Sequence, residues 1–253
     1  MSKKTYTIKQ PLDLSKLVTS DFPYLKKMDR EQEDMVIKLF KSKRVIVDSA
    51  AGSGKTVCLT QAMKALKDKG YIDKIYYVVF PVQEGSLGFL PGDLPDKILE
   101  YAIPFKQALI EAGVNPQHLD LKRMCDEFWD TEYNVVPHTF LRGRTLDGVG
   151  IIIDEAQNGT LDELQKIFTR ITESCYVGIA GHRGQMDIGN SGFPEYIQHF
   201  KIGKMKGIFR DIEFAKLTHN YRGPFSAYAD RIGEFKNEDF NEDEFDKIYF
   251  GGE

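Results

Sequence analysis

The sequence contains no long apolar run. No stretch approaches the roughly 20 apolar residues that a membrane-spanning helix needs, and no apolar segment follows the lysines of its N-terminus, which argues against a secretory signal. Its three cysteines, Cys58, Cys125 and Cys175, are too widely spaced to predict a cysteine-based metal site. These absences predict a cytoplasmic protein with buried, reduced thiols.

The charge is unevenly distributed along the chain. The formal net charge is −4, but the segment from Glu234 to the C-terminus holds eight acids and two lysines, so the remainder carries +2. Such a body can bind nucleic acid through a local patch, although nothing in the overall charge requires it. The tail at 236–253 mixes acids with aromatic residues, which predicts either a loose tail or a segment that docks on a protein partner.

Short apolar runs, rich in Val, Ile and Tyr, recur along the chain as buried strands do. They lie at 44–48, 74–80, 133–137, 149–153, 175–180 and 212–217. Helical patterns separate several of them, and Asp29 is placed to cap a helix at 31–41. Strands that alternate with helices predict an α/β fold with a mostly parallel sheet and helices on both faces.

The predicted domain occupies residues 29–235, between an N-terminal arm at 1–28 and the acidic tail. The segment 83–130 interrupts the alternation of strands and helices. It holds four prolines, Pro91, Pro95, Pro104 and Pro116. We therefore predict an insertion of helices and loops that caps one edge of the core.

A glycine-rich loop follows the first predicted strand and precedes a predicted helix at 55–69. The loop consists of Ser49, Ala50, Ala51, Gly52, Ser53, Gly54, Lys55 and Thr56. Strand, glycine-rich loop and helix N-terminus are the context of a phosphate-binding P-loop, in which backbone N–H groups bind the phosphates. Lys55 would reach the β- and γ-phosphates, and the Thr56 hydroxyl would bind Mg²⁺. Ser49 stands where the usual motif has its first glycine.

Two acids end the apolar run at 149–153. Asp154 would hold Mg²⁺ through water, and Glu155 would activate the attacking water as a base. Alone, such a pattern also fits a strand that enters a surface turn. The P-loop earlier in the chain favours the catalytic interpretation.

Two further polar residues follow later predicted strands. Gln185 could sense the γ-phosphate or orient water, and the alternative is an ordinary loop glutamine. Arg222 could stabilise charge in the transition state, and the alternative is a surface arginine at the start of a helix. Both interpretations remain open for each residue.

Four segments together resemble the PhoH family in order and spacing, over about residues 30–235. They are the P-loop, Pro-Val-Gln-Glu-Gly-Ser-Leu-Gly-Phe-Leu-Pro-Gly-Asp at 81–93, Leu-Arg-Gly-Arg-Thr-Leu at 141–146, and Ile-Ile-Asp-Glu-Ala-Gln-Asn at 152–158. The resemblance implies a RecA-like P-loop NTPase core that binds ATP and Mg²⁺. It also implies a relation to superfamily 1 helicases, whose Gly-Asp-x-x-Gln and Asn-Tyr-Arg motifs are similar to 181–185 and 220–222.

Some details follow from this resemblance alone. Gln32 matches the helicase glutamine that contacts adenine, although a polar helix face is an equal alternative. His182 stands where the helicase motif has aspartate, so the positioning of water can differ there. Phe80 stands where the family usually has arginine before Pro81, which removes a basic contact. The arm and the tail are too short for the nuclease or RNA-binding domains that some members carry.

The predicted activity is hydrolysis of ATP to ADP and phosphate, coupled to single-stranded RNA or DNA. The alternatives are an ATPase switch or remodeller that acts on a protein partner, and a phosphotransferase, against which Glu155 argues. Arg142 and Arg144 could contact nucleic acid or a neighbouring subunit, or be solvated loop charges. A second basic stretch is formed by Lys201, Lys204, Lys206 and Arg210. Because the chain has room for one core, we predict a homo-oligomer, a hexameric ring in which Arg222 acts on its own or a neighbour's ATP.

Overall fold

The computed structural model describes residues 27–81, 94–126, 129–182, 184, 188–232, 240–242, 245 and 248. Six strands form one sheet in the order β3-β2-β4-β5-β1-β6, and every neighbouring pair is parallel. The strands are β1 (Arg44–Ser49), β2 (Ile75–Val79), β3 (Tyr133–Pro137), β4 (Gly150–Ile153), β5 (Tyr176–Gly181) and β6 (Glu213–Leu217). The predicted fold class is confirmed, since each predicted strand corresponds to one observed strand.

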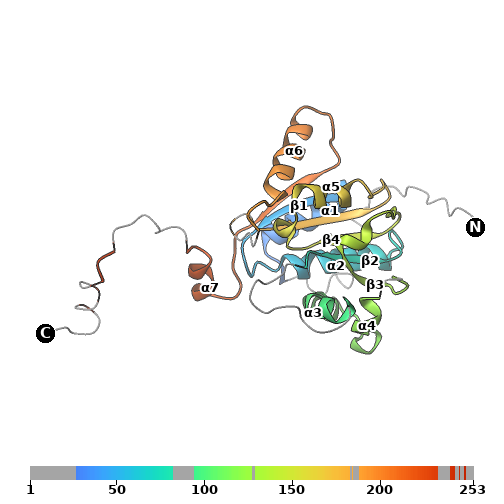
Figure 1. Ribbon diagram of the computed structural model, residues 1–253, viewed down its shortest axis with the longest axis horizontal. Coiled ribbons are helices and arrows are strands. Elements are labelled where there is room, and N and C mark those ends of the chain that lie inside the picture. The colour runs from blue at the N-terminus through green and yellow to red at the C-terminus, as the bar shows by residue number, and fades with distance from the viewer. Residues whose placement is uncertain are drawn as a thin grey trace, which may run out of the picture.

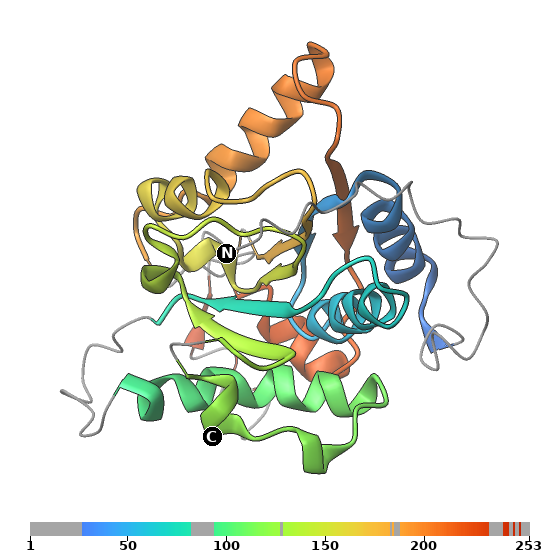
Figure 2. The same cartoon turned by 90° about the vertical axis from the view of Figure 1, so that its right-hand side faces the viewer.

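Helices cover both faces of the sheet. Alternate residues of a strand face opposite sides, so Val45 and Val47 join one hydrophobic cluster and Ile46 joins the other. The first cluster includes buried residues of α1 (Arg30–Ser42), α2 (Lys55–Asp68) and α3 (Leu94–Glu111). The second includes residues of α5 (Leu161–Phe168) and α6 (Phe193–Met205). Figure 2 shows α6 on one side of the sheet and α3 on the other.

Helix α1 begins with the predicted cap. The Asp29 side chain accepts a hydrogen bond from the Gln32 backbone N–H (2.8 Å), and the Gln32 side chain accepts one from the Asp29 N–H (3.1 Å). This reciprocal capping box satisfies backbone donors that the first helical turn leaves unpaired. It also fixes the Gln32 side chain at the start of the helix.

The described part of the segment 83–130 is mainly helical. Helix α3 packs against α2, while α4 (Leu121–Met124) packs against the edge strand β3. The Phe105 ring of α3 stacks on the Tyr77 ring of β2, with 4.7 Å between centroids. The segment therefore supports a strand residue that reaches the candidate site described below. The division into arm, domain and tail stays a prediction, and residues 1–26 and most of the tail lie outside the described residues.

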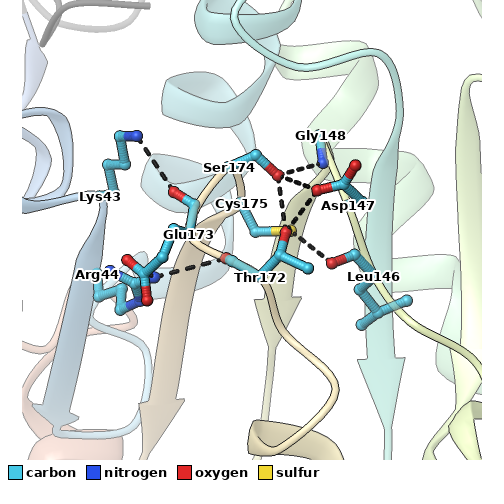
Figure 3. A network of polar contacts seen from close by, with 9 residues as sticks. All are labelled: Lys43, Arg44, Leu146, Asp147, Gly148, Thr172, Glu173, Ser174 and Cys175. Carbon is cyan, nitrogen blue, oxygen red and sulfur yellow. Dashed lines mark hydrogen bonds and ion pairs between the residues drawn. The ribbon is translucent and has the colours of Figure 1, made fainter. Parts of the chain in front are cut away.

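A polar network ties together the N-terminal ends of the strands (Figure 3). The Asp147 carboxylate, before β4, accepts a hydrogen bond from the Thr172 hydroxyl (2.7 Å), before β5. The Gly148 N–H donates to the Ser174 hydroxyl (2.7 Å), and Arg44 pairs with Glu173 (2.9 Å). Because the strands are parallel, this network lies at the edge of the sheet opposite to the P-loop.

None of the helices in the described ranges is long and apolar enough to cross a bilayer.

Candidate active site

The P-loop connects β1 to α2 at the C-terminal edge of the sheet. Gly52 and Gly54 have left-handed backbone conformations, with φ of +65° and +77°. A Cβ atom at Gly54 would lie 2.9 Å from Gln32 Nε2, and one at Gly52 would lie 2.8 Å from Asn220 Oδ1. The loop is therefore held between α1 and the segment after β6, and both positions require glycine.

Asp154 follows β4 and lies directly beside the start of α2. The Thr56 hydroxyl donates a hydrogen bond to Asp154 Oδ2 (2.6 Å), and the Tyr77 hydroxyl donates to the same oxygen (2.7 Å). The Glu155 N–H donates to Asp154 Oδ1 (2.9 Å). These three donors fix the orientation of a buried carboxylate. Burial, followed by the Asp154 charge, raises the pKa of Tyr77 well above its ordinary value, so the phenol stays a donor.

This pair of oxygen-bearing side chains suits Mg²⁺. The ion prefers oxygen ligands and is usually held by one or two carboxylates together with substrate phosphates and water. Thr56 and Asp154 supply a hydroxyl and a carboxylate oxygen at the phosphate-binding loop. Within the described ranges no group of three or more His, Cys, Asp or Glu side chains could hold a metal. Thr56 and Asp154 would provide part of the coordination shell of such an ion, and substrate phosphates and water would complete it.

Lys55 and Glu155 form an ion pair, with 2.9 Å between Nζ and Oε1. Burial would lower the pKa of Lys55, but the Asp154 and Glu155 carboxylates outweigh it and raise that pKa above its ordinary value. Burial would likewise raise the pKa of Glu155, but Lys55 and a hydrogen bond from Gln157 outweigh it and lower that pKa. Both groups are therefore charged at neutral pH, and Glu155 is a carboxylate, as a base must be.

The backbone of Glu155 adopts the left-handed conformation, with φ of 50° and ψ of 42°. A non-glycine residue in this region is strained by roughly 1–3 kcal/mol, and such strain is concentrated at functional sites. The turn directs the Glu155 side chain toward Lys55 instead of continuing β4. Its consequence is that the two acids of the motif face different partners.

Gln157 is a further residue of the site, to which the sequence analysis assigned no role. Its side chain is buried, and its Nε2 donates a hydrogen bond to Glu155 Oε2 (2.6 Å). Its Oε1 accepts one from the His182 N–H (3.0 Å), just after β5. Gln157 thus links the expected base to the end of a neighbouring strand. Its position in the Asp-Glu-Ala-Gln segment was the available signal, but its partner at the end of β5 is remote in sequence.

Gln32 supports the P-loop through a hydrogen bond to the backbone of the loop. Its Nε2 donates a hydrogen bond to the Ser53 carbonyl (2.8 Å), and its side chain is buried. The other side of its amide belongs to the cap of α1. In this structure Gln32 therefore braces the loop, and its contact with adenine stays a proposal.

Arg222 lies over the P-loop of its own chain. The Tyr221 N–H donates a hydrogen bond to the Gly52 carbonyl (3.0 Å), and Arg222 Cγ lies 2.9 Å from where a Gly52 Cβ would be. The positive charge of Arg222 partly opposes the rise in the pKa of Lys55 that the two carboxylates cause. The two cations are therefore close enough to repel each other. Gln185, which was predicted to sense the γ-phosphate or orient water, lies outside the described residues.

The two arginines after β3 have different surroundings. The Arg144 guanidinium lies over the Trp129 ring, 4.0 Å from its centroid, and Trp129 is itself buried against Tyr76. Arg142 is exposed. In the second basic stretch, Lys204 pairs with Glu213 (2.5 Å). Of these cations, Arg142 is therefore the cleaner probe of a surface contact.

Removing the Tyr77 hydroxyl is expected to weaken the site without dismantling it. In Tyr77→Phe, Asp154 loses one of its donors, so we expect the affinity for Mg²⁺ to fall by about tenfold, the lower end for a lost outer contact of a metal ligand. The free energy of unfolding should fall by about 1 kcal/mol. A Mg²⁺ titration of nucleotide binding and a urea unfolding curve measure the two effects.

Tyr176→Phe is the matched control for this substitution. Its hydroxyl is also buried in a strand, but it has no hydrogen-bond partner among the described residues. Its removal should leave the Mg²⁺ titration unchanged. Equal Mg²⁺ dependence in the two variants would contradict a role of Tyr77 in orienting Asp154.

Comparison with known proteins identifies the family that the chain resembles. The family model described as PhoH-like protein matches residues 24–220. The PhoH-like protein of Bacillus subtilis (strain 168) is 34% identical over 160 residues, which cover 62% of this chain and 48% of that protein. Protein PhoH of Escherichia coli (strain K12) is 32% identical over 182 residues, which cover 69% and 49%. The chain thus spans about half the length of these curated relatives.

A solved structure with a similar course of the chain is the UvsW helicase from bacteriophage T4. Its TM-score is 0.49, with 14% sequence identity over 79% of this chain and 68% of that one.

Proposed function

We propose that this chain, which belongs to the PhoH-like protein family, is a P-loop NTPase whose reaction is the Mg²⁺-dependent hydrolysis of ATP to ADP and phosphate. One observation carries the proposal: Lys55 and Thr56, at the start of α2, are paired within 2.9 Å with Glu155 and Asp154, after β4. Phosphate ligands, metal ligands and a base thereby meet at one edge of the sheet.

Each group has a separate role in this proposal. Lys55 and the N–H groups of 49–56 bind the β- and γ-phosphates, and Thr56 and Asp154 hold Mg²⁺. The ion would supply neutralisation of charge on the phosphates. Glu155 exchanges Lys55 for the attacking water and accepts its proton. Because this base adjoins the metal-binding aspartate, water fits as the acceptor better than an alcohol does, which favours hydrolysis over phosphotransfer.

Three residues complete the proposed machinery. Arg222 stabilises the charge that develops on the γ-phosphoryl group, and Gln157 positions Glu155. Gln32 contacts adenine, or it holds the phosphate-binding loop in place; its hydrogen bond to the Ser53 carbonyl supports the second role. Gln185 stays a proposal for γ-phosphate sensing.

We further propose that ATP hydrolysis is coupled to single-stranded RNA or DNA. The support is the exposed Arg142, which lies beside the stacked Arg144 and could contact a backbone phosphate. A switch that acts on a protein partner is the second candidate, because the acidic, aromatic tail suits docking. For such a switch, the rate of ATP hydrolysis should not change when polynucleotide is added. It should change when residues 234–253 are removed.

Single-stranded RNA is expected to stimulate hydrolysis, and Arg142→Ala should reduce that stimulation. The loss of one phosphate contact should also lower the slope of binding against salt by about one unit on a logarithmic plot. Steady-state ATPase assays with RNA, with DNA of the same sequence, and without polymer measure the effect. Lys41→Ala, an exposed cation in the last turn of α1, is the matched control.

The outcome of this assay decides between the candidates. Stimulation by DNA alone would assign the coupling to DNA, and hydrolysis unaffected by either polymer would contradict nucleic-acid coupling. Arg142 is preferred to Arg144 as the probe, because Arg144→Ala would also uncover the Trp129 ring.

A homo-oligomer, proposed as a hexameric ring, stays part of this proposal, as does a cytoplasmic location. The structure changes the reasons for the ring. Arg222 lies on its own P-loop, so a neighbouring subunit need not supply this arginine. The remaining reason is that the described residues form one sheet, and therefore one core. A motor needs a second core to close on ATP, and a neighbouring subunit would supply it.

A further inference from the structure

A second carboxylate contacts the P-loop, and the proposed reaction does not use it. Asp230 follows the short helix α7 (Pro224–Ala229), which begins two residues after Arg222. Its Oδ2 accepts a hydrogen bond from the Ala51 N–H (3.3 Å), across 179 residues of sequence. The same oxygen lies 3.9 Å from His182 Nε2, and the Asp230 side chain is only 10% exposed. The contact between Asp230 and Ala51 is therefore shielded from solvent, and it lies at the loop that is proposed to bind phosphate.

The Asp230 carboxylate is placed to compete with a bound triphosphate for the backbone N–H groups of the P-loop. Amides of a P-loop attract anions, and a carboxylate on one of them is already such an anion. A phosphate brought to the loop carries the same sign of charge, and like charges at a poorly solvated site disfavour each other. His182, the other neighbour of Asp230, follows β5, and its backbone is linked through Gln157 to Glu155. Asp230 therefore lies toward the end of the loop where Glu155 would act on the γ-phosphate.

The helix that carries Asp230 is largely exposed. No residue of α7 is buried, and its apolar side chains face outward, with Phe225 89% and Tyr228 63% exposed. The Ser226 hydroxyl accepts a hydrogen bond from Asn220 Nδ2 (3.0 Å). Figure 1 shows α7 apart from the layers of the sheet and its covering helices. Because no side chain of α7 is buried in the core, loss of the contact between Asp230 and Ala51 would favour a change in the position of this helix.

We propose that Asp230 is an internal competitor for the γ-phosphate, so that ATP displaces its carboxylate from the Ala51 N–H and α7 moves with it. This inference rests on the proposed function, because it requires a triphosphate on the P-loop. It assigns Asp230 as a residue that sets the preference between triphosphate and diphosphate. It also makes the position of α7 depend on which nucleotide is bound.

The first test is direct nucleotide binding, which does not depend on hydrolysis. Asp230→Asn keeps the size of the side chain and an acceptor oxygen but removes the charge. We expect its affinity for a fluorescent ATPγS to be about tenfold tighter than that of the wild type, since an ionised acceptor makes the stronger hydrogen bond that ATP must break. Its affinity for the corresponding ADP should change by less than half as much on a logarithmic scale. Asp211→Asn removes the same charge from an exposed position before β6, at the opposite edge of the sheet, and is the matched control.

The second test follows α7 itself. Cys58, Cys125 and Cys175 are all buried, and burial raises the pKa of Cys58 to about 12 and that of Cys125 to about 11. A thiol introduced by Tyr228→Cys can therefore be labelled selectively with a fluorophore. ATPγS should lower the anisotropy of the label in the otherwise wild-type chain. In an Asp230→Ala background, which has no acceptor for the Ala51 N–H, the anisotropy should be low from the start and should not respond.

The two tests separate failure of this inference from failure of the proposed function. The inference is overturned if Asp230→Asn and Asp211→Asn bind ATPγS equally well, or if ATPγS binds to the labelled chain without a change in anisotropy. The NTPase proposal survives both results, because binding is observed. If the wild type binds neither nucleotide, the proposed function is overturned and this inference with it.

Discussion

Glu155→Gln is expected to reduce kcat for ATP hydrolysis by about 10²–10⁴-fold, the usual contribution of a positioned general base. Glutamine has the same length and can adopt the same strained backbone, but its amide cannot accept a proton from water. ATP binding should persist or become tighter, because Lys55 loses the carboxylate with which it pairs. Single-turnover hydrolysis and equilibrium binding of ATP, with Mg²⁺, measure the two quantities separately.

Glu173→Gln is the control for the loss of a paired carboxylate. Glu173 pairs with Arg44 at the opposite edge of the sheet, so its substitution should leave kcat unchanged. Wild-type hydrolysis in Glu155→Gln would place the base elsewhere. Loss of ATP binding in that variant would instead mean that Glu155 organises the phosphate site.

Arg222→Ala is expected to reduce kcat by about 10³-fold, the low end for an arginine that stabilises phosphoryl transfer. The structure also predicts that this defect stays within one chain, because the Arg222 side chain packs on Gly52 of the same P-loop. Mixing Arg222→Ala with Lys55→Ala protein should therefore restore no activity. ATPase rates across a range of mixing ratios measure this.

Complementation in that mixture would contradict the arrangement and show that Arg222 serves a neighbouring subunit. Arg222→Lys is the companion variant, because it keeps the charge but not the planar group that bonds two oxygens at once. It should recover only part of the lost rate. Full recovery would reduce the role of Arg222 to its charge.

The sequence predicted the features that depend on neighbouring residues. The strand runs, the cap at Asp29 and the turn from β1 through the P-loop into α2 each have local causes, namely apolar patterning, a capping box and glycines. The structure also brings Lys55, Thr56, Asp154 and Glu155 together, because β1 and β4 are parallel and end at the same edge. The catalytic roles of these residues stay predictions.

Other features depend on partners that are remote in sequence. Tyr77 is an ordinary strand tyrosine until the sheet order places β2 beside β4, where its hydroxyl reaches Asp154. Asp230 reads as one acid in a helical stretch, yet it contacts a loop 179 residues earlier. For Arg144 the sequence left a nucleic-acid contact, a subunit contact and a solvated charge open, and its position over the Trp129 ring required the structure. Patterns along the chain do not contain these pairings.

The strained turn at Glu155 has a consequence for directed evolution. The left-handed conformation costs an ordinary residue roughly 1–3 kcal/mol, while glycine and asparagine adopt it more readily. Under the proposed role of Glu155 as the base, a laboratory selection that rewards only heat resistance would therefore favour variants at this position that fold well but lose most of their hydrolytic activity. Libraries designed to raise the thermal stability of this protein should keep Glu155 unchanged or be screened for hydrolysis at every round. Thermal stability and the proposed catalytic role favour different residues at this position.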